Sequence, residues 1–176
     1  MDSIVSMPYD EMVSDLHGSK PILEAGLKQA VASENLKTEA EIRAKLSTVT
    51  HLFGEREASF RQTVQAIALF KPLNEPKRAG GMYCSIGYQM KRRDMAKANE
   101  YMRTGIAILE KHQDTAALES GYNNYGVLKE MENLLDSAKF YYPKSYAFSR
   151  SKNDSVALPC SLNHLAVVEL LRENFT

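Results

Sequence analysis

The chain has 176 residues with 22 basic and 22 acidic side chains, so its formal net charge is zero. This balance gives no electrostatic case for nucleic acid or an anionic membrane as a partner. No apolar stretch approaches the roughly 18 residues that a membrane-spanning helix needs, and the first residues lack the pattern of a secretion signal. We therefore expect no direct membrane insertion and a cytoplasmic chain as given, or an extracytoplasmic one if it is a mature or truncated fragment.

Apolar residues recur with helical spacing along nearly the whole chain, and glycine and proline fall mostly between these stretches. His17-Gly18 is expected to end the first helix, Thr38 and Glu41 form a capping box for the third, and Pro143 should kink the eighth. In chain order the predicted helices cover residues 9–16, 19–33, 38–53, 56–70, 77–91 and 94–111, and three more begin near 114, 134 and 154.

A repeat of about forty residues organises these helices. Asn74, Asp114 and Asp154 follow one another at equal intervals of forty positions, and each precedes a predicted helix. Small residues keep nearly the same period, with spacings of 41, 39 and 40: Ala25, Ala66, Gly105 and Ser145. A fixed period of this length indicates stacked supersecondary units, none of which can bury its own apolar face alone.

Within each repeat, large and small side chains alternate on the two helices in a way that lets the helices interlock. Gly87 and Gly126 lie in first helices, where two backbones could approach closely, and the turn after Gly87 is one residue shorter than the turn after Gly126. Second helices carry a small residue, a large one four residues later and a small one three residues after that. The four sets are Gly18/Ile22/Ala25, Ser59/Thr63/Ala66, Ala98/Met102/Gly105 and Ala138/Tyr142/Ser145.

These features resemble the tetratricopeptide repeat (TPR) family, in a longer variant of about forty residues. The stretches that carry the resemblance are Tyr122-Asn123-Asn124-Tyr125-Gly126, Asp136 to Tyr142, Asn153 to Ala157 and Ser161 to Ala166. The resemblance implies an all-α, right-handed superhelix of stacked antiparallel hairpins with about nine helices. The expected division is an N-terminal segment at 1–18 and a repeat domain at 19–176, with repeats at 38–73, 74–113, 114–153 and an incomplete 154–176.

In this family the first helix of each hairpin lines the concave surface, where peptides bind. By motif match, the candidate binding residues are Cys84, Tyr88, Lys91, Asn123, Asn124, Val127, Glu130, Asn163 and Val167. Asn124 matches a position at which some members hold a peptide backbone or a terminal carboxylate, but lysines that would complete a carboxylate clamp are not evident. Hydrogen bonding between helices is the alternative interpretation of the asparagines.

Motifs for catalysis or metal binding are not evident in the sequence. The four histidines form no paired metal spacing, and Gly80-Gly81 lacks the strand–loop–helix context of a phosphate-binding loop. Cys84 and Cys160 are almost two repeats apart, so we expect small buried hydrophobic residues rather than a disulfide. The nine tyrosines are expected mainly in the core. The sequence predicts neither an enzyme nor a cofactor.

The predicted function is therefore non-catalytic recognition of a protein or peptide on the concave face. The opening segment and the Asn153–Ala157 linker resemble N-terminal repeat regions of bacterial membrane-anchored regulators, which would make this chain the sensory part of a larger protein. One alternative is a small-ligand sensor. Another is self-assembly, or truncation, at the last helix, whose apolar residues cover much of its circumference: Val156, Leu162, Leu165, Val168 and Leu171.

Overall fold

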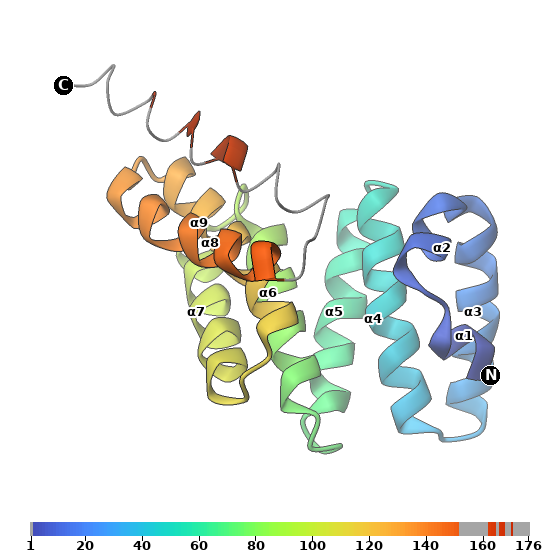
Figure 1. Ribbon diagram of the computed structural model, residues 1–176. Coiled ribbons are helices and arrows are strands. Elements are labelled where there is room, and N and C mark those ends of the chain that lie inside the picture. Colours follow the sequence, from blue (N-terminus) through green and yellow to red (C-terminus); the bar gives the residue numbers. More distant parts are fainter. Residues whose placement is uncertain (1, 152–161, 165, 168–169, 171–176) are drawn as a thin grey trace. The chain divides into compact units, whose positions relative to one another are not determined.

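All regular structure in the described part of the chain is α-helical (Figure 1). The computed structural model describes residues 2–151, 162–164, 166, 167 and 170. The helices are α1 (Asp2–Ser6), α2 (Tyr9–Ser14), α3 (Leu16–Ala32), α4 (Leu36–Leu52), α5 (Arg56–Phe70), α6 (Pro76–Met90), α7 (Met95–Lys111), α8 (Thr115–Met131) and α9 (Leu135–Ser151). The prediction of an all-α chain of successive helices is confirmed.

The chain divides into two compact units, Met1–Met82 and Tyr83–Thr176, which are described separately. In the amino-terminal unit, α3 packs on α4 and α4 packs on α5. In the carboxy-terminal unit, α7 packs on α8 and α8 packs on α9. Within each unit these helices therefore contact their neighbours in chain order, as expected for helix hairpins joined by short turns.

Helix starts recur with half the predicted period. The helices α4 to α9 begin at positions 36, 56, 76, 95, 115 and 135, so consecutive starts differ by twenty positions except for one step of nineteen. The shorter step lies between α6 and α7, where the sequence predicted a turn with one residue fewer. A forty-residue repeat thus consists of two helices, each followed by one turn.

Five of the turns between the described helices share one backbone conformation. Within residues 2–151, a residue with positive φ follows helix after helix: Glu34, Gly54, Asn74, Gln113 and Asn133. The next residue donates its N–H to the carbonyl five residues earlier, as in Asn35 to Ala30 and Asp114 to Leu109, both at 3.0 Å. This is the Schellman motif, which satisfies the free carbonyls at a helix end. The residue that closes one helix is then the N-cap of the next.

Two predicted helix starts were wrong. Asn35, not Thr38, caps α4, because the Asn35 side chain accepts a hydrogen bond from the Thr38 N–H at 3.1 Å. Asp15 caps α3 in the same way by accepting from the Gly18 N–H at 2.9 Å. The helix therefore runs through His17-Gly18 rather than ending there.

The close approach predicted for Gly87 and Gly126 is confirmed. A Cβ atom on Gly87 would lie 2.9 Å from the Ala98 carbonyl oxygen, and one on Gly126 would lie 2.4 Å from the Tyr142 ring. Ser47 takes the same place in the amino-terminal unit, one full repeat before Gly87. These small residues set how closely the two helices of each hairpin can pack.

The small–large–small pattern on α3 was predicted one residue out of register. Ser19, Leu23 and Gly26 are buried, one forty-residue period before Ser59, Thr63 and Ala66, whereas Ile22 is 47% exposed. The sequence alone offered two similar sets one residue apart, and a strict forty-residue period would have chosen the buried one.

Residues 2–14 extend the repeat to the beginning of the chain. The Met7 sulfur lies 3.9 Å from the Ser19 hydroxyl, and both residues are one forty-residue period before the contacting pair Ser47 and Ser59. Helices α1 and α2 thus occupy the place of a first hairpin helix against α3. The sequence predicts a separate N-terminal segment at residues 1–18.

The first hairpin helix is broken because Pro8 has no N–H to continue it. The break leaves the Met7 carbonyl outside a helix, where it accepts a hydrogen bond from the Lys45 ammonium at 2.6 Å. Burial lowers the pKa of Lys45, an effect that Glu41 opposes and Arg78 reinforces. Lys45 therefore connects α4 to the break between α1 and α2.

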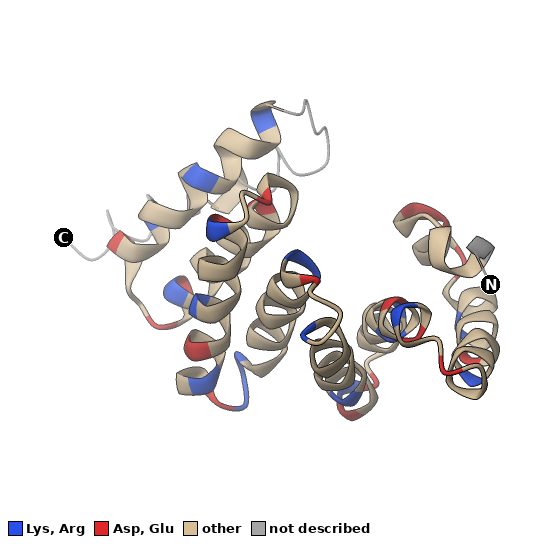
Figure 2. Ribbon diagram, turned by 90° about the horizontal axis from the view of Figure 1, so that it is seen from below, with Lys and Arg blue, Asp and Glu red and all other residues tan. Residues whose placement is uncertain are grey.

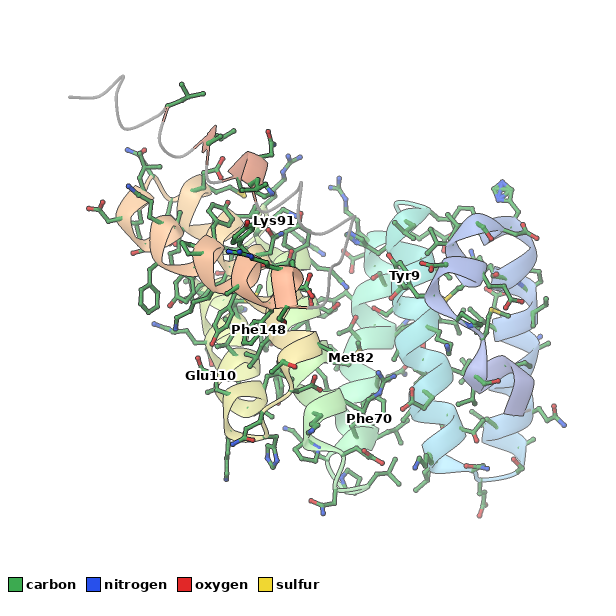
Figure 3. All side chains as sticks on the ribbon, in the orientation of Figure 1. Tyr9, Phe70, Met82, Lys91, Glu110 and Phe148 are labelled. Atoms are coloured by element: carbon green, nitrogen blue, oxygen red, sulfur yellow. The ribbon has the colours of Figure 1, made fainter. Side chains whose placement is uncertain are left out.

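The later proline does not end its helix, since α9 continues through Pro143 to Ser151. Tyr122, Tyr125 and Tyr142 are buried, which confirms the expectation of core tyrosines for these three. Phe148 (labelled in Figure 3) stacks on Tyr122 with ring centroids 6.1 Å apart.

Candidate functional site

The sequence-predicted binding residues on α6 and α8 fall at equivalent places in the repeat. Tyr88 and Val127 are separated by one repeat, as are Lys91 and Glu130. The pair Gly87 and Gly126 fixes this register through their equivalent hairpin contacts. We call the following half-buried residues of the carboxy-terminal unit the candidate stripe: Tyr88, Lys91, Asn123, Asn124, Val127 and Glu130.

The prediction that Cys84 belongs to the binding surface was wrong. It is only 4% exposed and belongs to the core formed by α6, α7 and α8. A Cβ atom on Gly121 would lie 3.4 Å from the Cys84 sulfur, so the glycine makes room for the thiol between α6 and α8. Burial raises the pKa of the Cys84 thiol to about 12. The residue is a free, neutral thiol inside the core, as expected from its distance along the chain from Cys160; Cys160 lies outside the described residues.

On α6, the stripe is formed by an aromatic ring and a cation. The Lys91 ammonium lies 3.2 Å from the centroid of the Tyr88 ring, a cation–π contact. Tyr88 itself packs against the core cluster around Met102 and Tyr125. Lys91 (labelled in Figure 3) directly follows α6. The core thereby fixes the ring, and the ring restricts where the ammonium can lie.

On α8, a carboxylate is held by groups from two other segments. The Tyr142 hydroxyl of α9 donates a hydrogen bond of 2.7 Å to Glu130. The His164 Nδ1 atom lies 3.9 Å from the same carboxylate, and its ring stacks on Tyr142 with centroids 4.9 Å apart. Burial, then the bond to Glu130 and the nearby Tyr88, raise the pKa of Tyr142. The hydroxyl is therefore a stable proton donor that orients the Glu130 carboxylate.

The asparagines and the valine complete the stripe. The Asn123 Oδ1 atom is buried and has no hydrogen-bond partner in the described part of the chain. Val127 packs beside Ala138 and Tyr142 of α9. The structure does not show the inter-helix hydrogen bond for this Asn123 oxygen that was one interpretation of the asparagines.

The predicted site residues in the last segment are only partly described. Asn163 is exposed and Val167 is half-buried. Leu162 is 51% exposed, so an apolar side chain of this segment does face solvent. The predictions for Val156, Leu165, Val168 and Leu171, and the cap at Asp154, lie outside the described residues.

Sequence reasoning missed Tyr142 as a neighbour of the stripe. A signal was present: Tyr122 donates to Glu110 at 2.6 Å, and Tyr142 donates to Glu130, with the same sequence separation between the partners in both cases. The second pair follows the first by twenty positions, the spacing of helix starts. A search for Glu and Tyr at this spacing would have linked α8 to α9.

The other charged and potentially metal-binding side chains of the described residues are dispersed. Residues of both charge signs occur along the helices of each unit (Figure 2). No group of three or more His, Cys, Asp or Glu in the described part could hold a metal ion. Among the described helices, none is long and apolar enough to cross a membrane.

Comparisons with known proteins bear on the fold alone. No protein-family profile matches the chain, and no curated protein matches it. Among solved structures, the chain is similar to the crystal structure of BtubC (BKLC) from P. vanneervenii, with a TM-score of 0.77 and 16% sequence identity, over 97% of this chain and 72% of that chain. At this identity the likeness shows the fold alone. It supports the all-α solenoid of stacked helix hairpins that the sequence predicts.

Proposed function

We propose that this chain is a non-catalytic recognition module of the TPR type, which binds a protein or peptide partner across the candidate stripe. The observation that carries the proposal is the pair of equivalent positions on neighbouring helices. Tyr88 and Lys91 on the α6 side match Val127 and Glu130 on α8, and all four are half-buried. A row of partly exposed apolar and charged side chains on adjacent helices offers both contact area and charge recognition.

The stripe is also ordered before any partner arrives. The Tyr88 ring positions the Lys91 ammonium, and the Tyr142 hydroxyl positions the Glu130 carboxylate. Fewer rotamers are then lost on binding, which lowers the entropic cost of association. These contacts support a binding surface better than a catalytic one, because neither contact pairs a nucleophile with a base.

Capture of partners from a source lysate tests the proposal. The wild-type chain is compared with Tyr88→Ala/Val127→Ala and with the control Phe140→Ala/Val64→Ala, which removes an exposed aromatic and an exposed valine elsewhere. We expect a partner that the stripe variant loses and the control retains, at unchanged helicity by circular dichroism. Equal capture by all three chains would contradict the proposed surface.

A small-ligand site is a second candidate function, favoured by one cavity. A cavity of about 340 Å³ lies in the amino-terminal unit between α1 and the first turns of α4. Its lining offers hydroxyl, amide, ammonium and carboxylate groups: Val5, Ser6, Asn35, Lys37, Thr38 and Glu41. A thermal shift with metabolites that Thr38→Val removes would support it, and no shift across a metabolite panel would exclude it.

Self-assembly through the last segment is the remaining proposal. Leu162 and Leu170 are both exposed there. Concentration-dependent oligomers that vanish in Leu162→Glu/Leu170→Glu would support it. A strictly monomeric chain by light scattering at high concentration would contradict it. A sensory role in a larger bacterial regulator is compatible with any of these binding modes.

A further inference from the structure

The cavity between α1 and α4 points to one class of ligand, and this inference rests on the small-ligand function proposed for that cavity. We propose that it binds an uncharged, hydroxyl-rich molecule, a neutral monosaccharide in its pyranose form. Three polar residues of the lining, Asn35, Thr38 and Glu41, bind the sugar hydroxyls, and Val5 supplies an aliphatic contact for the ring.

The charged side chains of the cavity already have counter-ions in the amino-terminal unit. The Glu41 carboxylate accepts a hydrogen bond of 2.9 Å from the Arg78 Nε atom and a second one from a terminal nitrogen of the same guanidinium. The Lys37 side chain is 69% exposed and its ammonium lies 3.4 Å from the Glu75 carboxylate, so water and Glu75 both screen its charge. A charged ligand would leave water without gaining an unpaired counter-ion, which is unfavourable. The lining therefore favours an uncharged ligand.

A further cation near Glu41 does not change this charge balance at the cavity wall. The Lys45 ammonium donates a hydrogen bond of 2.6 Å to the Met7 carbonyl, and Lys45 is not among the residues that line the cavity. Its electrostatic interaction with Glu41 adds to the pairing of that carboxylate with Arg78. Lys45 therefore helps to fix the cavity wall and does not act as an anion receptor.

The polar groups that face a ligand match the hydroxyls of a sugar. The Asn35 Oδ1 atom accepts from the Thr38 N–H at 3.1 Å, so the cap bond fixes the amide group. Within the described residues, the Asn35 amide nitrogen and the Thr38 hydroxyl have no other partner. The amide nitrogen donates, the hydroxyl donates or accepts, and each Glu41 oxygen keeps a lone pair beyond its bond to Arg78. A hydroxyl group, which both donates and accepts, can bond to all three.

The size and the apolar wall of the cavity narrow the ligand further. Its volume of about 340 Å³ lies at the lower end of the range of about 300–1,000 Å³ for small-molecule sites. Val5 is half-buried and brings an aliphatic side chain from α1, which packs on α4. A pyranose ring carries hydroxyls at its edge and C–H groups on its faces, so it can use both kinds of lining. The described lining has no aromatic side chain on which a nucleobase could stack.

Saturation-transfer NMR on the full chain tests the inference. The probes are glucose, galactose and mannose, and each is compared with its uronic acid and its amino sugar, which place a carboxylate or an ammonium on the same ring. We expect saturation transfer to at least one neutral sugar, and about fivefold or weaker binding of its two charged analogues, because a charge gains no unpaired counter-ion. No transfer to any neutral sugar, or equal or tighter binding of a charged analogue, would overturn the inference.

Two substitutions in the lining place the sugar in the cavity. Asn35→Asp keeps an oxygen that can cap α4 but loses the amide donor, and Thr38→Val loses the hydroxyl. Each should weaken sugar binding about fivefold, as expected for one lost hydrogen bond, with unchanged helicity by circular dichroism. The control Thr104→Val removes an exposed hydroxyl from α7 and should bind as the wild type does. Equal binding by all four chains would overturn the inference.

Removal of the counter-ion tests why the ligand should be uncharged. Arg78→Met takes away the guanidinium that pairs with Glu41, so the preference should shift from the neutral sugar toward the amino sugar, whose ammonium can replace it. Arg61→Met removes an exposed arginine of α5 and should keep the wild-type preference. If Arg78→Met also keeps the wild-type preference, the charge argument is wrong.

The outcomes separate this inference from the function on which it rests. A charged metabolite that raises the melting temperature of the wild type but not of Thr38→Val would overturn the uncharged class and leave the cavity as a ligand site. A metabolite panel without any thermal shift, together with no saturation transfer to the sugars, would remove both.

Discussion

In each unit two helices of a hairpin cross at close range, but the chemical groups at the two crossings differ. Between α4 and α5 the crossing is polar: the Ser47 and Thr63 hydroxyls lie 2.5 Å apart, and the Ser59 hydroxyl donates to the Ser47 carbonyl at 2.8 Å. Between α8 and α9 it is formed by Gly126 against the buried ring of Tyr142. The repeat therefore preserves position and volume at the crossing rather than residue type.

The difference has a functional consequence. A hydroxyl crossing satisfies its own polar atoms internally, because each one bonds to another residue of the crossing. The tyrosine crossing instead extends a hydroxyl out of the core to Glu130. The core of the carboxy-terminal unit thus orients a charged group of the candidate stripe, whereas these hydrogen bonds of the α4–α5 crossing stay within the crossing.

The largest expected effect comes from adding one methyl group to the glycine crossing. Gly126→Ala places a Cβ atom against the buried Tyr142 ring, so we expect a loss of about 2–3 kcal/mol in the free energy of unfolding. The control is Gly81→Ala, because nothing lies within 4 Å of a Cβ atom there; it should gain up to about 1 kcal/mol from helix propensity. Denaturant unfolding measures both, and equal effects would contradict the packing argument.

The next effect concerns the hydroxyl crossing. Ser47→Ala or Thr63→Val alone should cost about 1–2 kcal/mol, because each can leave a buried hydroxyl without one of its partners. The double variant should cost clearly less than the sum of the single changes. A double-mutant cycle by urea unfolding measures this coupling, and strict additivity would show that the two hydroxyls do not depend on each other.

Alkaline pH should distinguish the tyrosine crossing from the hydroxyl crossing by its effect on stability. Burial and the bonds to Glu110 and Glu130 raise the pKa of Tyr122 and Tyr142 in the folded chain. Unfolded tyrosines ionise near pH 10, so the unfolded state binds fewer protons above that pH and the folded chain loses stability as pH rises. We expect Tyr122→Phe/Tyr142→Phe to flatten this decline above about pH 10. Thermal melts at pH 7 to 11 measure it, with the exposed Tyr9→Phe as control.

The smallest predicted effect comes from giving α9 the N-cap side chain that the preceding helices have. Asp94 and Asp114 cap α7 and α8 through their side chains, whereas Leu134, one helix step after Asp114, cannot. Leu134→Asp should therefore stabilise the chain by about 0.5–1 kcal/mol. Met131→Asp, which adds the same charge in the last turn of α8, should not stabilise it. A melting temperature that rises equally in both would point to charge rather than capping.

The sequence was sufficient for features that depend on local periodicity. Helix order, the forty-residue period and the close contacts at Gly87 and Gly126 all follow from spacing, because side-chain bulk must alternate wherever two helices cross. The first helices were harder to predict, since Pro8 interrupts the apolar pattern and leaves two short pieces. Their place in the repeat became clear only through the contact of Met7 with Ser19.

Features that depend on contacts between distant residues were predicted less well. Cys84 falls at the correct position for a surface stripe, but Gly121 on α8 makes space that buries it. Thr38 matches a capping pattern, yet the tight turn at Glu34 moves the cap to Asn35. The orientation of Glu130 depends on Tyr142 and His164, which a single-helix pattern cannot reveal. The partner-binding role of the stripe remains a prediction.

The most direct test of the recognition surface is hydrogen exchange of the full chain with and without its captured partner. We predict slower exchange in the partner complex for backbone amides of α6 and α8 around Tyr88 and Val127, with unchanged exchange on α3 and α5. Protection confined to α3 and α5, with none around Tyr88 and Val127, would contradict the account.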